Sequence, residues 1–150
     1  MGLDMYLKAK RYVSEYQEED KALSTELMRH FPELRPEESI QNLDIRVGYW
    51  RKANAIHKWF VDNVQEGTDD CGSYWCSVEK LTELRDRCQR VLDFRHLAVE
   101  QLPTQNGFFF GDTNYDEWYF KDIERTRDIA NRAIELAESG KWDIEYQSSW

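Results

Sequence analysis

Basic and aromatic side chains coincide in one stretch of this sequence, which runs from Arg46 to Val64. Between Arg46 and Val61 there are four basic residues and no acidic residue, although the 150-residue chain carries a formal net charge of −9. Guanidinium and ammonium groups neutralise phosphate and carboxylate, and Trp and Tyr rings can stack on a base. We therefore expect this stretch, the basic aromatic patch, to bind an anionic, nucleotide-like ligand or a protein partner.

The residues expected to contact a ligand come from the patch and from the segment 107–119. Backbone N–H groups at the start of a predicted helix in the patch would favour an anion there. The predicted ligand-binding residues are Trp50, Arg51, Lys52, Asn54, His57, Phe110 and Tyr115. The alternative is that the two tryptophans of the patch, Trp50 and Trp59, pack in the core while its cations pair with carboxylates.

Patterns typical of catalysis are weaker. The sequence contains no nucleophile elbow, phosphate-binding loop, dinucleotide fingerprint or zinc-protease motif. His57 lies on the edge of an apolar stripe, which favours a hydrogen-bonded core or boundary histidine over a catalytic base. We predict no catalytic residue. An enzyme acting on a nucleotide or phosphate ester through His57 and a carboxylate is kept as a second alternative.

Metal-ligand types occur, but not in a metal-binding pattern. Cys71 and Cys76 are spaced C-x₄-C and could bind zinc together with a histidine, yet no second cysteine pair follows. Asp112, Asp116 and Glu117 are more simply capping residues of the last predicted helix than metal ligands. We therefore expect no metal and no cofactor.

The composition indicates a folded chain with an acidic surface. Of the residues, 41% are hydrophobic and 33% are charged, which is typical of a globular domain. Because nucleic-acid binders are usually basic, the net charge of −9 argues against direct nucleic-acid binding and favours basic partners. An acidic mimic of nucleic acid, which would inhibit a host DNA- or RNA-binding protein, is the first alternative function.

Location is predicted from what the sequence lacks. No apolar run approaches the length of a membrane span, and no signal peptide is recognisable. The three cysteines have no disulfide-framework spacing. We expect no membrane contact and a cytoplasmic location, and the many aromatic side chains would allow a homodimer.

Hydrophobic periodicity predicts an α+β fold, with a small mixed or antiparallel sheet packed against about four helices in one domain of residues 1–150. Strands are expected around 3–13, 40–47, 71–76, 107–111 and 142–150. Four helices are expected. Two of them cover 18–30 and 50–65, a third begins after Ser77 as its N-cap, and the last runs from Asn114 to about 139. Gly140 is expected to end the last helix.

Two of these elements carry the patch. The second strand is expected to bury Leu43, Ile45 and Val47, with Gly48 at its end or at a bulge. The helix over 50–65 would place Arg51, Asn54 and Lys58 on one face, because these residues are three and four positions apart.

Several short motifs suggest an origin. They are Gly2–Leu7, Gly48–His57, Trp59–Phe60, Leu102–Gln105, Gly107–Gly111, Tyr115–Tyr119 and Gln147–Trp150. In these motifs the chain resembles a family of small, uncharacterised proteins of bacteriophages and prophages. The resemblance implies no activity or cofactor. It implies a virus-encoded accessory protein in the cytoplasm of a bacterial host, where such proteins often act in counter-defence by inhibiting or redirecting host proteins.

Overall fold

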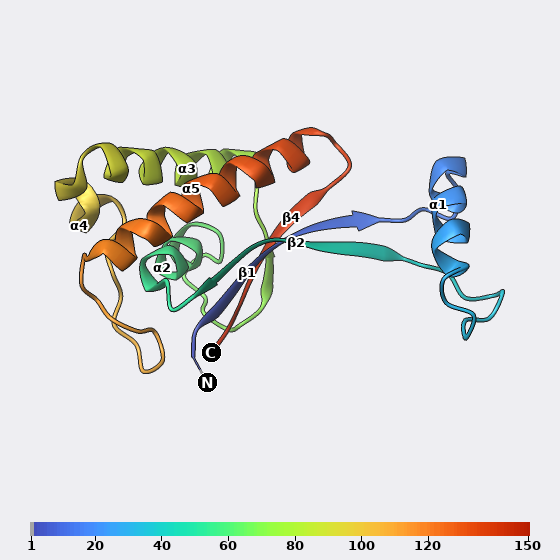
Figure 1. Cartoon of the computed structure of the whole chain (residues 1–150), viewed down its shortest axis with the longest axis horizontal. Helices are drawn as coiled ribbons and strands as arrows, with labels where there is room; N and C mark the ends of the chain where they lie inside the picture. Colours follow the sequence, from blue (N-terminus) through green and yellow to red (C-terminus); the bar gives the residue numbers. More distant parts are fainter. Residues whose placement is uncertain (1) are drawn as a thin grey trace.

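Four antiparallel strands form one sheet, in the order β2-β1-β4-β3 (Figure 1). A computed structural model describes residues 2–150. The strands are β1 (Asp4–Tyr12), β2 (Asn42–Arg51), β3 (Ser73–Trp75) and β4 (Asp143–Ser149). The helices are α1 (Glu18–Met28), α2 (Asn54–Asn63), α3 (Val78–Asp93), α4 (Ala98–Gln101) and α5 (Glu117–Glu138), with a 3-10 turn at Arg95–Leu97. The predicted α+β class is confirmed, and the sheet is antiparallel.

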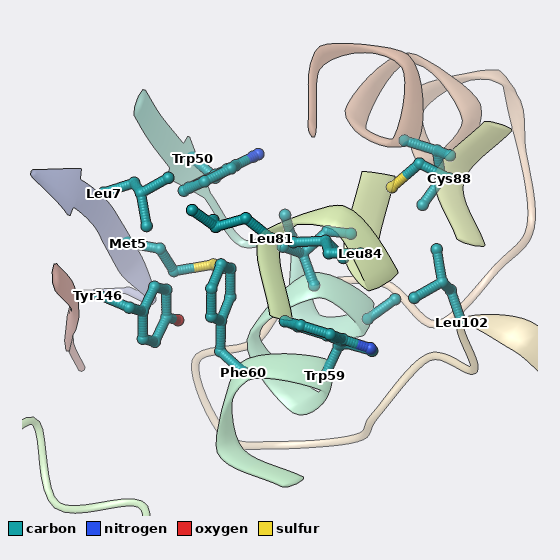
Figure 2. Packing of buried hydrophobic residues seen from close by; sticks show 14 of the residues in the cluster. Met5, Leu7, Trp50, Trp59, Phe60, Leu81, Leu84, Cys88, Leu102 and Tyr146 are labelled. Atoms are coloured by element: carbon teal, nitrogen blue, oxygen red, sulfur yellow. The ribbon is translucent and has the colours of Figure 1, made fainter. Parts of the chain in front are cut away.

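One face of the sheet forms the core. Along β1, Met5, Leu7 and Ala9 are buried and alternate with half-covered polar residues. Side chains from α2, α3 and α5 pack against this face in one cluster, as Figure 2 shows for Met5 beside Phe60 of α2. The ring of Phe60 stacks on Tyr146 of β4, with centroids 3.9 Å apart and an interplanar angle of 5°. The alternation predicted for β1 therefore sets which face the helices cover.

The hairpin of β1 and β2 extends beyond the rest of the sheet. Strand β4 pairs with β1 only as far as Lys10, so the distal part of the hairpin has no third strand beside it. Figure 1 shows this hairpin running away from α3 and α5 and carrying α1 at its far end. We call residues 13–41, at that end, the arm tip.

The helix predicted over 50–65 begins later than expected. Strand β2 continues through Trp50 and Arg51, and α2 starts only at Asn54. Between them Lys52 adopts a left-handed backbone conformation with φ of 58°, and its N–H donates to Leu3 O at 2.7 Å. An α-helix cannot pass through that conformation. The prediction that Arg51, Asn54 and Lys58 share one face of a helix is therefore wrong.

Gly48 lies inside β2 rather than at its end. The pairing register shifts between Leu7 and Lys8, which leaves Val47 as the extra residue of a bulge. A Cβ atom on Gly48 would lie 2.5 Å from Cγ2 of Ile129, so the glycine permits the close approach of α5. Ile45, predicted to be buried, is 48% exposed on β2, which is an edge strand of the sheet.

The segment 107–111, predicted as a buried strand, is a loop. A backbone hydrogen bond from Leu3 N–H to Phe109 O connects this loop to the residue that precedes β1. Phe110 is buried, whereas Phe108 is 93% exposed. The loop leads into α5, whose N-cap is Asp116, one of the capping residues expected for this helix, and not Asn114. The Asp116 side chain accepts a hydrogen bond from Tyr119 N–H.

Candidate functional site

The aromatic part of the predicted patch is buried. Trp50 and Trp59 are 1% and 3% exposed, and Figure 2 shows both rings among the core side chains. The indole N–H of Trp50 donates to Thr126 Oγ1 at 2.8 Å. Neither ring can stack on a ligand in this arrangement, so the alternative of core packing is correct for both tryptophans.

The basic part of the patch is divided. Lys58 pairs with Asp62 of the same helix at 2.7 Å. Arg51 and Lys52 are exposed, and no carboxylate oxygen of residues 2–150 lies within 4.0 Å of either charged group. Arg46 is exposed as well, with its guanidinium carbon 5.7 Å from the centre of the Tyr49 ring. Arg51 and Lys52, at the end of β2, are the open cations that lie next to the start of α2.

His57 belongs to a buried hydrogen-bond network. Its Nδ1 lies 2.7 Å from the Tyr146 hydroxyl and its Nε2 lies 2.9 Å from Asp69 Oδ2. Burial raises the pKa of Tyr146 well above its usual value, so the hydroxyl stays protonated. Because the Asp69 carboxylate only accepts, the ring proton lies on Nε2, and Nδ1 accepts from the Tyr146 hydroxyl. The Nε2–H then donates to Asp69, whose other oxygen accepts from Trp150 Nε1 at 3.0 Å. With both nitrogens engaged and no exposed surface, His57 does not face a ligand.

Asn54 and Phe110 hold a loop against the start of α2. The Asn54 amide donates to Phe110 O at 3.0 Å and to Asp112 O at 2.8 Å, and its oxygen accepts from Gln105 N–H at 2.9 Å. The Phe110 ring packs edge-on against His57. These contacts use the polar atoms of Asn54, so the two residues position the loop instead of offering free groups.

A hollow of about 360 Å³ lies between the start of α2 and the start of α5. It is lined by Arg51, Lys52, Ala53, Asn54, Ala55, Ile56, Thr104, Gly111, Asp112, Asn114, Asp116, Trp118, Tyr119, Asp122 and Ile123. We call it the α2–α5 hollow. Its volume is at the small end of the range for sites that bind small molecules.

Gly111 allows the loop to close one side of the hollow. It has φ of 85°, and a Cβ atom there would lie 3.0 Å from Lys52 Cβ. Tyr115, another predicted ligand residue, is half-buried, and its hydroxyl accepts a hydrogen bond from Thr104 N–H at 3.1 Å. Thus three of the seven predicted residues, Arg51, Lys52 and Asn54, line the hollow, and the other four do not line it.

The hollow also contains residues that sequence reasoning did not select. Trp118 is 73% exposed, and Lys121 Nζ lies 4.6 Å from the centre of its ring. Asp122 is half-buried, and burial, opposed by Arg125 and reinforced by Asp116, raises its pKa to about 6. The sequence does contain a signal for Trp118. This tryptophan falls on the polar side of the amphipathic helix that follows Asp116, where an exposed ring would be expected.

Together these groups make a mixed-charge site. Two cations and three carboxylates, those of Asp112, Asp116 and Asp122, line one hollow without forming an ion pair there, and the exposed indole of Trp118 lies beside them. Such a site can bind an anionic group and, at the same time, a hydrogen-bond donor and an aromatic ring.

The remaining predictions concern metals and membranes. Over residues 2–150 no three His, Cys, Asp or Glu side chains are arranged to hold a metal ion. Burial raises the pKa of the Cys76 thiol to about 12, which disfavours the thiolate that zinc requires. None of the described helices is long and apolar enough to span a membrane. Comparison of the chain with protein-family models, curated proteins and solved structures gives no match.

Proposed function

We propose that this protein acts by binding a small, anionic, nucleotide-like molecule in the α2–α5 hollow. The observation that carries the proposal is that Arg51 and Lys52, both exposed and without a carboxylate partner, line the same hollow as Asp122 and the exposed ring of Trp118. By such binding, a virus-encoded accessory protein, which is the origin that the resemblance implies, would sequester the molecule in its host.

Each group has a distinct task in this proposal. The guanidinium of Arg51 and the ammonium of Lys52 neutralise a phosphate or carboxylate. Asp122 accepts a hydrogen bond from an amino or hydroxyl group. Trp118 stacks on the ring, an interaction that contributes about 1–3 kcal/mol per base in single-strand binding proteins. The volume of about 360 Å³ suits a ligand no larger than a mononucleotide.

Binding is favoured over the alternative of an enzyme that uses His57. The Nδ1 and Nε2 atoms of His57 are engaged by Tyr146 and Asp69 in the core. A general base must come within hydrogen-bond reach of the proton that it removes. His57 does not line the hollow, so the residue on which the enzymatic alternative depends would not reach a ligand there.

Calorimetric titration tests the proposal directly. The ligands are adenosine and uridine monophosphates, with the unphosphorylated nucleosides and inorganic phosphate as references. We expect the monophosphates to bind and the double variant Arg51→Glu with Lys52→Glu to lose at least tenfold in affinity.

The matched control is Arg90→Glu with Lys141→Glu. Both residues are exposed, neither lines the hollow, and the change in net charge is the same. Unchanged binding in the Arg51/Lys52 variant, equal loss in the control, or no heat with any phosphate would remove the hollow as the binding site.

A further inference from the structure

Helix α1 is poorly covered. Its only buried residue is the acidic Asp20, which accepts hydrogen bonds from Arg11 Nη2 at 2.6 Å and Ser14 N–H at 2.9 Å. Leu23 and Leu27 are only half-buried. A helix of 11 residues without side-chain capping is marginal in water, and most helices in proteins are stabilised by packing of an apolar face. The apolar face of α1 therefore lacks the cover that a helix of this length normally has.

A groove lies beside this helix. Its volume is about 580 Å³, and its apolar lining comes from Val13, Met28, Leu34, Pro36 and Ile40. Near it, Tyr16 is 88% exposed and Phe31 is 44% exposed. The segment that lines this groove lies at the far end of the extended hairpin (Figure 1). An apolar lining gathered in one place is typical of an interaction site rather than of scattered surface residues.

The charge of the arm tip selects the occupant. Residues 14–41 contain eight acidic and three basic residues, a net charge of −5, and the rest of the chain carries −4. Three of the eight acidic residues form ion pairs: Asp20 with Arg11, Glu18 with Lys21 and Glu26 with Arg29. Five glutamates, Glu15, Glu19, Glu33, Glu37 and Glu38, have no cationic partner in residues 2–150, and Arg35 is the one cation left over in the tip.

Charge repulsion disfavours a second copy of this chain as the partner of the arm tip. Pairing two tips would bring together two units of −5, and placing a tip on the remainder of another copy would oppose −5 and −4. Like charges across an interface are unfavourable and slow the encounter of the partners. A basic segment with an apolar face satisfies both the groove and the unpaired glutamates.

We propose that the arm tip is a docking surface for a basic, amphipathic segment of a partner protein. The apolar side of that segment fills the groove beside Met28 and Leu34, and its lysines or arginines meet Glu15 and Glu38, the two unpaired glutamates that line the groove. The hairpin holds this surface away from the α2–α5 hollow, so the two sites bind independently.

The test uses a synthetic helical peptide of about five turns, with leucine on one side and lysine on the other. A leucine–glutamate peptide with the same pattern and a scrambled leucine–lysine peptide serve as references. Binding to the full chain is followed by fluorescence anisotropy, and hydrogen exchange locates the protected amides. We expect the patterned basic peptide to bind, with protection confined to residues 13–41 and affinity that falls as salt rises.

Two variants separate the apolar and the charged contributions. Met28→Glu with Leu34→Glu should lower the affinity for the basic peptide at least tenfold. Glu15→Gln with Glu38→Gln should also weaken binding of that peptide and flatten the salt dependence of its affinity. The matched control changes two exposed glutamates outside the tip that have no ion pair, Glu66→Gln with Glu138→Gln, and should leave binding unchanged. Near-ultraviolet circular dichroism checks that the core of each variant remains folded.

Several outcomes would overturn the proposal. These are equal binding of the scrambled or acidic peptide, protection outside the tip, or equal weakening in the control. Sedimentation equilibrium provides one more. A concentration-dependent dimer that Met28→Glu with Leu34→Glu abolishes would assign the groove to a second copy instead.

Discussion

The hydroxyl of Tyr146 on β4 lies 2.7 Å from Nδ1 of His57 on α2, and both residues are fully buried. This bond joins a strand to a helix through the core, and Asp69 extends it to the surface. It explains why the histidine of the basic aromatic patch supports the fold instead of facing the hollow.

Tyr146→Phe is expected to destabilise the protein by about 1–3 kcal/mol, because Nδ1 of His57 would lose its donor while remaining buried. The phenyl ring preserves the stacking on Phe60. Urea denaturation followed by circular dichroism measures the change. Tyr74→Phe, which removes a surface hydroxyl that donates to Asp70, is the control and should cost less than half as much. Equal losses in the two variants would argue that the His57 network contributes nothing special.

Gly48→Ala is expected to destabilise the fold by about 1–3 kcal/mol, since the new methyl group would press against Ile129 of α5. Ile129→Ala alone should also destabilise, by loss of packing. Combining the two should recover part of the loss, with a coupling energy of about 0.5–3 kcal/mol in a double-mutant cycle. Strictly additive losses would show that α5 moves away at no cost.

Asp122→Asn should stabilise the protein above pH 6. The pKa of Asp122 is raised to about 6 in the folded protein, from an ordinary value of 3.8, mainly by burial. The folded state therefore holds its proton more tightly than the unfolded state does, and stability decreases as the pH rises from about 4 to 6. We expect the asparagine variant to be more stable than the wild type by about 1–2 kcal/mol at pH 7.5 and to show no gain near pH 4.

The measurement is urea denaturation at both pH values. Glu138→Gln is the control, because this exposed residue lies on the same helix without an ion pair, and it should show no such pH dependence. A gain for Asp122→Asn that is the same at both pH values would contradict the assignment.

Trp118→Ala should weaken binding of a nucleoside monophosphate by about 1–3 kcal/mol, the contribution of stacking on one ring. Stability should change by less than about 0.5 kcal/mol, because the side chain is largely exposed. Trp75→Ala is the matched control: Trp75 is 64% exposed and does not line the hollow. Calorimetry on both variants distinguishes stacking in the hollow from a general effect of removing a surface ring.

Local patterns predicted most of the elements. The alternation of β1 and the apolar stripe of α5 each follow from residue types a few positions apart, and these stripes face the core as expected. The Ser77 cap was also predicted correctly, since Ser77 Oγ accepts a hydrogen bond from Lys80 N–H. The α+β class follows from such periodicities because each requires only a neighbouring apolar layer.

The site was predicted only in part. The concentration of positive charge at the end of β2 was visible in the sequence, and Arg51 and Lys52 are indeed exposed. Trp50 was misplaced because an aromatic residue fits either an amphipathic helix or a strand, and β2 continues through it. The role of Trp118 depends on the hollow that the start of α5 shares with the start of α2, which brings together residues more than 60 positions apart, such as Ile56 and Trp118.

The sequence by itself determined the repeating patterns that make strands and helices, because those patterns act between residues close along the chain. Only the tertiary structure decided which tryptophans are buried, that His57 bonds to Tyr146 and Asp69, and that the first hairpin carries an acidic tip away from the other helices. These features depend on long-range packing and on where β4 stops pairing with β1, and no local pattern encodes either.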